Sequence, residues 1–159
     1  MKVEYINPFI NSVYNLFSTM LSAEVERGEV GIARDSQTPR HITAIIGVSG
    51  HARGTVAISF PNQTALSMVG RMLGMELRVL DDSVTDGISE IVNIVAGRAK
   101  AQFDFEPPLE ISLPTVIRGN SYSVDYPSKT TWLEVPFQSE LGDFILRVTF
   151  EKFSKQNNE

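Results

Sequence analysis

Apolar residues near the beginning of the chain recur at the spacing of an amphipathic helix. The pattern predicts a helix over residues 8–22, with an inward face formed by Phe9, Val13, Phe17 and Met20. Asn7 is a good N-cap residue, and Pro8 suits the first helical position because its missing N–H would have no partner there. The more polar side of this helix carries Asn11, Ser12, Asn15 and Ser18.

The apolar pattern then changes its period, over residues 24–31 and again from residue 41. Residues 41–48 are typical of a strand, and residues 54–60 alternate apolar with small or polar side chains. Because the short link between these two runs contains Gly50, they predict an antiparallel hairpin. Helical spacing returns over residues 64–73, where the inward residues are Ala65, Met68, Val69 and Met72.

The longest amphipathic pattern predicts a helix over residues 83–103. Its core-facing side is formed by Val84, Ile88, Ile91, Val92, Val95 and Ala99. The preceding Asp81-Asp82-Ser83 supplies the N-cap, and Ser83 followed by Asp86 resembles a capping box with Asp in place of Glu. This helix separates the predicted hairpin from the strands that follow.

The last third of the chain has the period of strands again. Three strands are predicted, over residues 110–118, about 131–137 and 142–151. Residues 142–150 echo residues 54–60, since each run is the second arm of a predicted hairpin downstream of a long amphipathic helix. Although the residue-level similarity is weak, the echo predicts a duplicated helix-plus-strands unit whose halves share one sheet. We expect one domain over residues 1–153 and a flexible tail over residues 154–159.

Composition limits the chemistry that the chain can perform. A net charge of −5 over 159 residues, with no cluster of Lys or Arg, argues against non-specific binding to nucleic acid or an anionic membrane. The absence of cysteine excludes disulfides, thiolate metal sites and thiol nucleophiles. No run approaches the roughly 18 apolar residues of a membrane span, and no cleavage-site pattern is present near the N-terminus. We therefore expect a soluble cytoplasmic protein.

The candidate chemistry lies on the side of the 83–103 helix that faces away from its apolar residues. On a helical wheel this narrow stripe contains Asp86, Glu90, Asn93, Gly97 and Lys100. Glu90 and Asn93 are three positions apart, so their side chains are neighbours on the helix surface. Glu and Asn are ordinary on a solvated face, but a glycine inside a helix costs about 1 kcal/mol relative to Ala. Gly97 leaves a shallow place where another backbone can approach, which favours a functional face.

Other combinations of residues have less support. His41 and His51 are the only histidines, and their places in a strand and a turn support neither a metal site nor a Ser/His/Asp triad. The three glycines at 47, 50 and 54 lack the Lys-Ser/Thr ending and the strand-to-helix context of a phosphate-binding loop. A hairpin turn explains them better.

The stripe also carries a family resemblance. Asp86-x-x-x-Glu90-x-x-Asn93-x-x-x-Gly97 resembles the signature helix of the CheC/CheX/FliY chemotaxis phosphatases. The flanking residues 3–9, 52–57 and 111–116 are most similar to the CheX members of that family. The likeness extends over about residues 3–151 and is therefore more specific than the motif alone.

This resemblance implies an α/β (α+β) fold of two pseudo-symmetric helix-plus-strands halves sharing a central, largely antiparallel sheet backed by long helices. It also implies hydrolysis of the phospho-aspartate of a CheY-type response regulator. Asn93 would orient the attacking water, and Glu90 would pair with a lysine of the regulator. Gly97 would let the partner surface sit close, and Asp86 would either cap the helix or contact the rim of the partner. Mg²⁺ would belong to the regulator, with no cofactor of the chain's own, and the protein would be a homodimer.

Some members of the family have two active helices, one in each half. In the first helix of this chain, Ser12 stands where the Glu would be, Asn15 keeps the Asn and Pro8 replaces the Asp. Because the acid is missing, the first site is expected to be silent.

Two rival functions remain at this point. The main one is a non-catalytic module of the same fold, either a response-regulator-binding protein or a flagellar switch component. The presence of both Glu90 and Asn93 argues against it, because binding alone needs no water-positioning amide. The other rival is a metal- or nucleotide-dependent enzyme, but the sequence offers neither a set of metal ligands nor a phosphate-binding loop.

Overall fold

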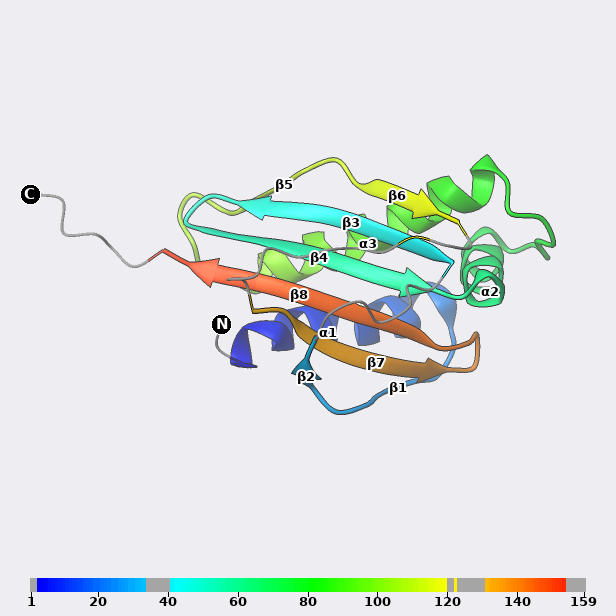
Figure 1. Cartoon of the computed structure of the whole chain (residues 1–159), viewed down its shortest axis with the longest axis horizontal. Coiled ribbons are helices and arrows are strands. Elements are labelled where there is room, and N and C mark those ends of the chain that lie inside the picture. The colour runs from blue at the N-terminus through cyan, green and yellow to red at the C-terminus, as the bar shows by residue number, and fades with distance from the viewer. Residues whose placement is uncertain (1–2, 34–40, 120–121, 123–130, 154–159) are drawn as a thin grey trace, which may run out of the picture.

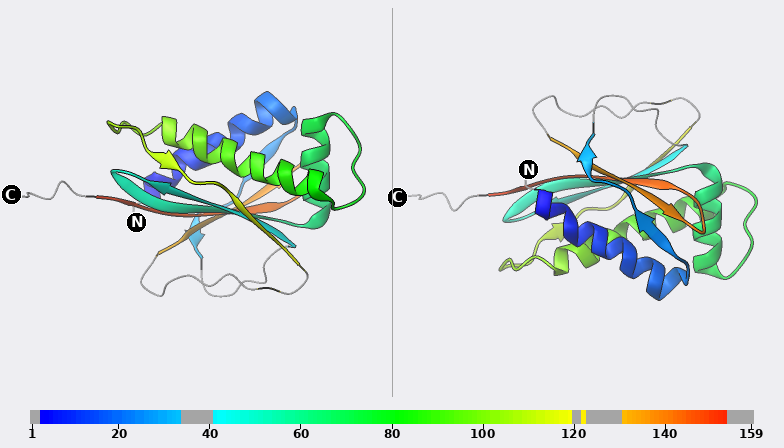
Figure 2. Two further views of the ribbon diagram at one scale, coloured as in Figure 1. Left: turned by 90° about the horizontal axis from the view of Figure 1, so that it is seen from above. Right: turned by 90° about the horizontal axis from the view of Figure 1, so that it is seen from below.

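The computed structural model describes residues 3–33, 41–119, 122 and 131–153, which form an α+β fold of two layers. One layer is an eight-stranded sheet, and the other consists of helices that cover one of its faces (Figure 1). The helices are α1 (Asn7–Leu16), α2 (Asn62–Leu73) and α3 (Asp82–Ala101). α1 and α3 lie next to each other on the sheet, whereas α2 stands at one end of it (Figure 2).

The sheet is built around two hairpins. Its strands are β1 (Val25–Arg27), β2 (Gly31–Ile32), β3 (Ile42–Ser49), β4 (Ala52–Phe60), β5 (Glu110–Ile111), β6 (Thr115–Arg118), β7 (Leu133–Ser139) and β8 (Phe144–Lys152). The β3–β4 and β7–β8 hairpins meet where β4 pairs with β8, over a register that runs from Ala52↔Lys152 to Ser59↔Ile145. Gly54 allows this close approach, because a Cβ at that position would collide with the Thr149 carbonyl oxygen. Every pairing between the described strands is antiparallel.

The short outer strands are exchanged between the two halves. β1 and β2 follow α1 in the chain but pair with β7 of the second hairpin. β5 and β6 follow α3 but pair with β3 of the first hairpin. The order β1–β7–β8–β4–β3–β5 is therefore pseudo-symmetric about the β4–β8 pair. This confirms the predicted duplication and shared sheet, while the exchange of the outer strands was not predicted.

The N-cap predicted for the first helix is wrong, whereas the segment Asp81-Asp82-Ser83 does supply the cap of α3. Asn7 is the first residue of α1 rather than its cap, because a 3-10 turn over Val3–Ile6 runs into the helix and leaves Ile6 in helical geometry. The cap of α3 is Asp81, whose carboxylate accepts hydrogen bonds from the backbone N–H groups of Ser83 and Val84 at 3.0 and 3.3 Å. The proposed capping box of Ser83 and Asp86 was therefore wrong.

The helix and strand boundaries also differ in two places. α1 ends at Leu16 and continues as a π-helical turn over Phe17–Leu21, which closes at Ser22 with φ 48°. The strand predicted over residues 110–118 is interrupted after Ile111. There the hydroxyl of Ser112, rather than a backbone carbonyl, accepts the Gly47 N–H at 2.8 Å, and Pro114 has no N–H to donate.

The core lies between the sheet and the helices. All six residues predicted for the apolar side of α3 are buried. Aromatic rings fill the space beneath α1, where Phe144 stacks on Phe137 with ring centroids 5.0 Å apart and on Phe17 at 5.7 Å. Such rings bury large apolar areas and fix the helices on the sheet.

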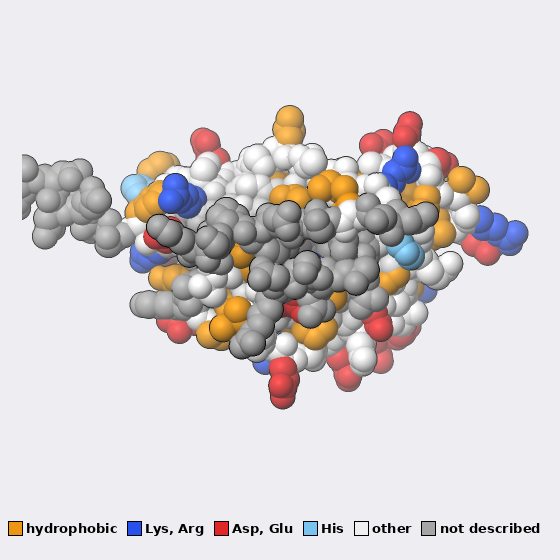
Figure 3. Space-filling view, viewed as in Figure 1, with side chains coloured by type: hydrophobic (Ala, Val, Ile, Leu, Met, Phe, Trp, Pro, Cys, Tyr) orange, Lys and Arg blue, Asp and Glu red, His pale blue; other side chains and the backbone are white. Residues whose placement is uncertain are grey.

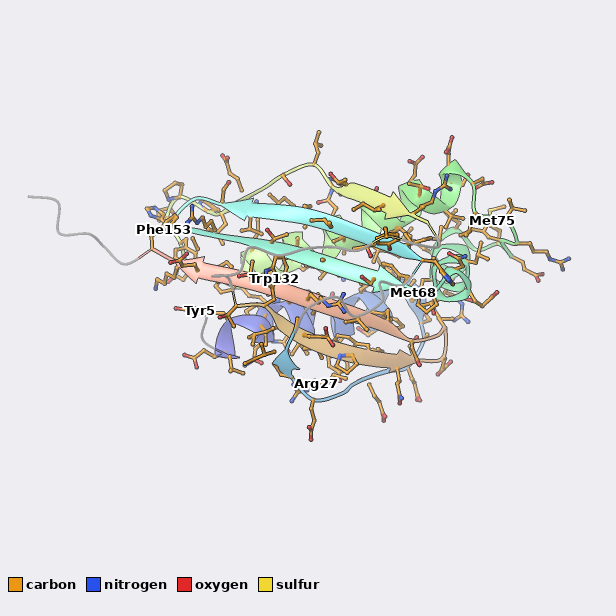
Figure 4. The ribbon with its side chains drawn as sticks, in the orientation of Figure 1. Tyr5, Arg27, Met68, Met75, Trp132 and Phe153 are labelled. Atoms are coloured by element: carbon orange, nitrogen blue, oxygen red, sulfur yellow. The ribbon has the colours of Figure 1, made fainter. Side chains whose placement is uncertain are left out.

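The opposite face of the sheet is more polar. There Arg147, only 6% exposed, donates from Nε to the Glu134 carboxylate at 2.8 Å. The Thr43 hydroxyl hydrogen-bonds Tyr122 at 2.8 Å, and burial raises the pKa of this tyrosine despite that bond. Trp132 also lies over the sheet (Figure 4). The described acidic and basic side chains that are visible on this face lie along its margins (Figure 3).

Substitution of Gly87 tests directly how α3 packs on α2. A Cβ at this position would collide with both methyl groups of the buried Val69, whose branched side chain has little freedom to move. We expect Gly87→Ala to lower the free energy of unfolding by about 1–3 kcal/mol despite its higher helix propensity. Chemical denaturation measures the change.

Gly97→Ala is the matched control, because the same substitution in the same helix meets no close contact. Equal stability changes in the two variants would contradict this packing.

Candidate active site

The stripe predicted on α3 lies on the outer side of that helix, away from the sheet. Asp86 and Glu90 are exposed, and Asn93 and Gly97 are half-buried. Helix geometry places the Glu90 and Asn93 side chains as neighbours one turn apart, with Cβ atoms about 5–6 Å from each other. The structure thus brings the four predicted residues onto one continuous face.

The polar groups of this face have no partner among the described residues. The side chains of Glu90 and Asn93 make no hydrogen bond or ion pair with any of the described residues. Asp86 is equally free in that part of the chain, since the cap of α3 is formed by Asp81. A carboxylate and an amide held one turn apart on a rigid helix are therefore available to another molecule.

Gly97 extends the face by one more turn. A Cβ built there would have one neighbour among the described residues, Ile111 Cδ1 at an ordinary 3.9 Å. Nothing in the described fold therefore requires glycine at this position. Gly87 is different, because it is needed for packing against Val69, and sequence reasoning missed it. The helical period places Gly87 beside the core-facing Val84 and Ile91, but its contact with Val69 depends on a segment that the period of α3 does not reveal.

The corresponding face of α1 is used differently. Ser12 was predicted on the polar side of the helix, but it is fully buried, and its hydroxyl donates to the Pro8 carbonyl at 2.7 Å. It also accepts from Gln102 Nε2 at 3.2 Å. Asn15 accepts from Arg98 Nη1. These bonds join α1 to the end of α3, so α1 presents neither an acid nor a free Asn15 carbonyl here.

The face on α3 is separate from the hollow beside α2. None of its four residues lines the hollow of about 690 Å³ near the end of α2, which is bounded by residues such as Arg71 and Met75. Met75 lies at the end of the molecule where α2 stands and α3 begins (Figure 4). A helix face with free polar groups and no enclosing pocket suits contact with a cleft of another macromolecule better than enclosure of a small substrate.

Metal ligands are not gathered in the described structure. Within residues 3–33, 41–119, 122 and 131–153, no three His, Asp or Glu side chains come together as a possible metal site. His51 Nε2 lies 3.0 Å from the Glu106 carbonyl, and its ring stacks on Phe105. None of the described helices is long and apolar enough to cross a bilayer.

Comparison with known proteins identifies the class. The family model "Chemotaxis phosphatase CheX" matches residues 42–138, more than half of the chain. The chain therefore belongs to the CheX family of chemotaxis phosphatases, which are protein phosphatases. This membership favours an enzyme over the non-catalytic module of the same fold.

Similarity to individual proteins agrees with this family assignment. The chain is 29% identical over 126 residues to the CheY-P phosphatase CheX of Thermotoga maritima, covering 78% of this chain and 81% of that protein. A CheC-like chemotactic protein of Shewanella oneidensis MR-1 has a TM-score of 0.82 and 31% identity, with 95% and 100% of the two chains covered. The CheX-CheY-BeF3-Mg²⁺ complex of Borrelia burgdorferi shares the fold, with a TM-score of 0.77 and 22% identity over 94% and 99% of the chains.

Gly97→Ala tests whether phosphatase activity can change without a loss of folding stability. Because the added methyl group projects outward and meets no close contact, the free energy of unfolding should stay the same or rise by up to about 1 kcal/mol. Phosphatase activity should nevertheless fall, because the methyl group prevents close approach to α3. Denaturation and phosphate release, measured on one preparation, test both parts, and unchanged activity would contradict a contact at Gly97.

Proposed function

We propose that this protein hydrolyses the phospho-aspartate of a CheY-type response regulator, with Asn93 orienting the attacking water and Glu90 anchoring the complex. The observation that carries the proposal is the free Glu90–Asn93 pair on the outer face of α3. The CheY-P phosphatase activity of the Thermotoga maritima relative supports the choice of substrate. The Borrelia burgdorferi complex supports the kind of partner.

The chemistry suits an amide. In the reaction the water oxygen attacks phosphorus, the bond between phosphorus and the aspartyl oxygen breaks, and free carboxylate and inorganic phosphate are released. An acyl phosphate is already reactive, so the reaction needs mainly a water molecule held in line with the leaving oxygen. A carboxamide can hold that water because it both donates and accepts hydrogen bonds. Asn93 can perform this role without any change in protonation.

Glu90 would set the register of the complex. Its exposed carboxylate is one turn from Asn93 and can pair with a lysine beside the regulator's phosphorylation site. When that ion pair forms, Asn93 is directed toward the phosphoryl group. Asp86, a further turn away, would contact the rim of the regulator, and Gly97 would let the regulator approach the helix on the other side.

Mg²⁺ would be supplied by the regulator. It would neutralise phosphoryl charge during the attack. The face on α3 provides the amide and the anchor, and the described residues gather no ligand cluster of their own. The ion named in the Borrelia burgdorferi complex fits this division.

We further propose that residues 1–153 act as one catalytic domain, as a homodimer in the cytoplasm. The sheet has an outer edge at each end, at β1–β2 and at β5–β6, where strands of another copy could pair. Sedimentation velocity of the purified protein tests the dimer.

Asn93→Ala is the main test of the catalytic role. We expect it to bind the regulator normally but to lose turnover by about 10²–10³-fold, the cost of removing one preorganised polar group. The measurements are decay of phosphorylated CheY and binding to CheY loaded with BeF3⁻ and Mg²⁺. Asn15→Ala, in the corresponding position of α1, should keep the parental turnover. Parental decay with Asn93→Ala would refute the proposed function.

Glu90→Gln tests the anchor. Loss of the carboxylate should weaken binding to CheY loaded with BeF3⁻ and Mg²⁺ by about tenfold or more, because the lysine of the regulator is left unpaired in the complex. Glu26→Gln on β1 removes the same charge at a distant edge and should have no effect. If both variants lose affinity equally, net charge rather than an ion pair is responsible.

A further inference from the structure

Leu113 has the most exposed large apolar side chain among the described residues, at 90%. It lies in the link between β5 and β6, at the outer edge of the sheet (Figure 1). A single exposed leucine is common on protein surfaces and needs no explanation by itself. Its significance depends on how firmly it is held and on what lies beside it.

The link that carries Leu113 is fixed to β3 on both sides. Ser112 N–H donates to the Gly47 carbonyl at 2.9 Å, and the Ser112 hydroxyl accepts from Gly47 N–H at 2.8 Å. Two residues beyond Leu113, pairing with β3 resumes at Thr115↔Ile45. Pro114 further restricts the backbone. The leucine is therefore presented to solvent by a well-anchored segment.

The same link runs back along α3. At one end Ile111 Cδ1 lies 3.9 Å from the place where a Gly97 side chain would begin. At the other end Arg118 donates to the Leu80 carbonyl at 3.0 Å, just before α3 starts. A strand advances about 3.3 Å per residue and a helix 1.5 Å, so two residues beyond Ile111 correspond to about four residues of α3. This places Leu113 about level with Asn93, and Figure 2 shows β5 beginning beside the end of α3.

We propose that Leu113 is an apolar docking contact for the response regulator, an inference that rests on the proposed function. The regulator that receives Glu90 and Asn93 in its phosphorylation cleft would cover the flank of α3 with the surface beside that cleft. Because Gly97 has no side chain to stand between α3 and the β5–β6 link, a partner can contact both. Glu90 and Asn93 would then supply charge and chemistry, and Leu113 would supply apolar area.

Substitution of Leu113 separates affinity from chemistry. We expect Leu113→Ala to raise the Kd for CheY loaded with BeF3⁻ and Mg²⁺ on the order of fivefold to tenfold, and Leu113→Asp to raise it further. KM for phosphorylated CheY should rise in parallel while kcat stays at the parental value, because Asn93 is untouched. Both variants should keep the parental thermal unfolding midpoint, since the side chain is exposed.

The pseudo-symmetry of the sheet provides a matched control. Ile32 on β2 is 62% exposed at the opposite edge of the sheet. Ile32→Ala and Ile32→Asp should leave both Kd and KM unchanged.

The alternatives give different results. Parental Kd and KM with Leu113→Asp, alongside an inactive Asn93→Ala, would overturn the docking contact and leave the proposed function standing. Parental turnover with Asn93→Ala would overturn the proposed function and the docking contact with it. If Leu113→Asp dissociates a dimer in sedimentation velocity without changing the Kd for the regulator, the leucine serves contact between copies and the proposal is wrong.

Discussion

The pairing of β4 with β8 is the interaction on which the other features of this structure depend. It joins the hairpins of two similar halves through eight consecutive residue pairs. A single hairpin with one helix would leave much of its apolar face in water. Joined, the two hairpins form one apolar surface broad enough for α1 and α3, and the stacked rings of Phe17, Phe137 and Phe144 fill the space beneath α1. The outward direction of the α3 face follows from this packing.

The two halves share an architecture but differ in the use of their first helices. On α3 the carboxylate of Glu90 and the amide of Asn93 have no partner within the described chain. On α1 the equivalent positions are occupied by Ser12, which is buried, and by Asn15, which accepts from Arg98 of α3. Polar groups that could have faced a substrate instead bind the helices together. These bonds hold α1 against the end of α3.

The sequence predicted features that depend on local periodicity. The buried and exposed sides of α3 follow from its 3.6-residue repeat, so the outward placement of Glu90 and Asn93 was predicted correctly. The N-caps were predicted less accurately, because each prediction required a choice between neighbouring residues. Asp81 competed with Ser83 for the N-cap of α3, and Ile6 was already helical where Asn7 was expected to cap α1. Features set by distant segments could not be predicted, among them the exchanged outer strands and the packing of Gly87 on Val69.

The exchange of outer strands also bears on how such a protein could evolve or be shortened. β5 and β6, which flank α3, are hydrogen-bonded to β3 of the other half. After a gene duplication, either half could lose its catalytic residues. Neither half could be deleted, because its outer strands pair with the sheet edge of the other half. A fragment limited to the second half would lack β3, the strand that pairs with β5 and β6 beside α3. Each half therefore supports the sheet edge of the other.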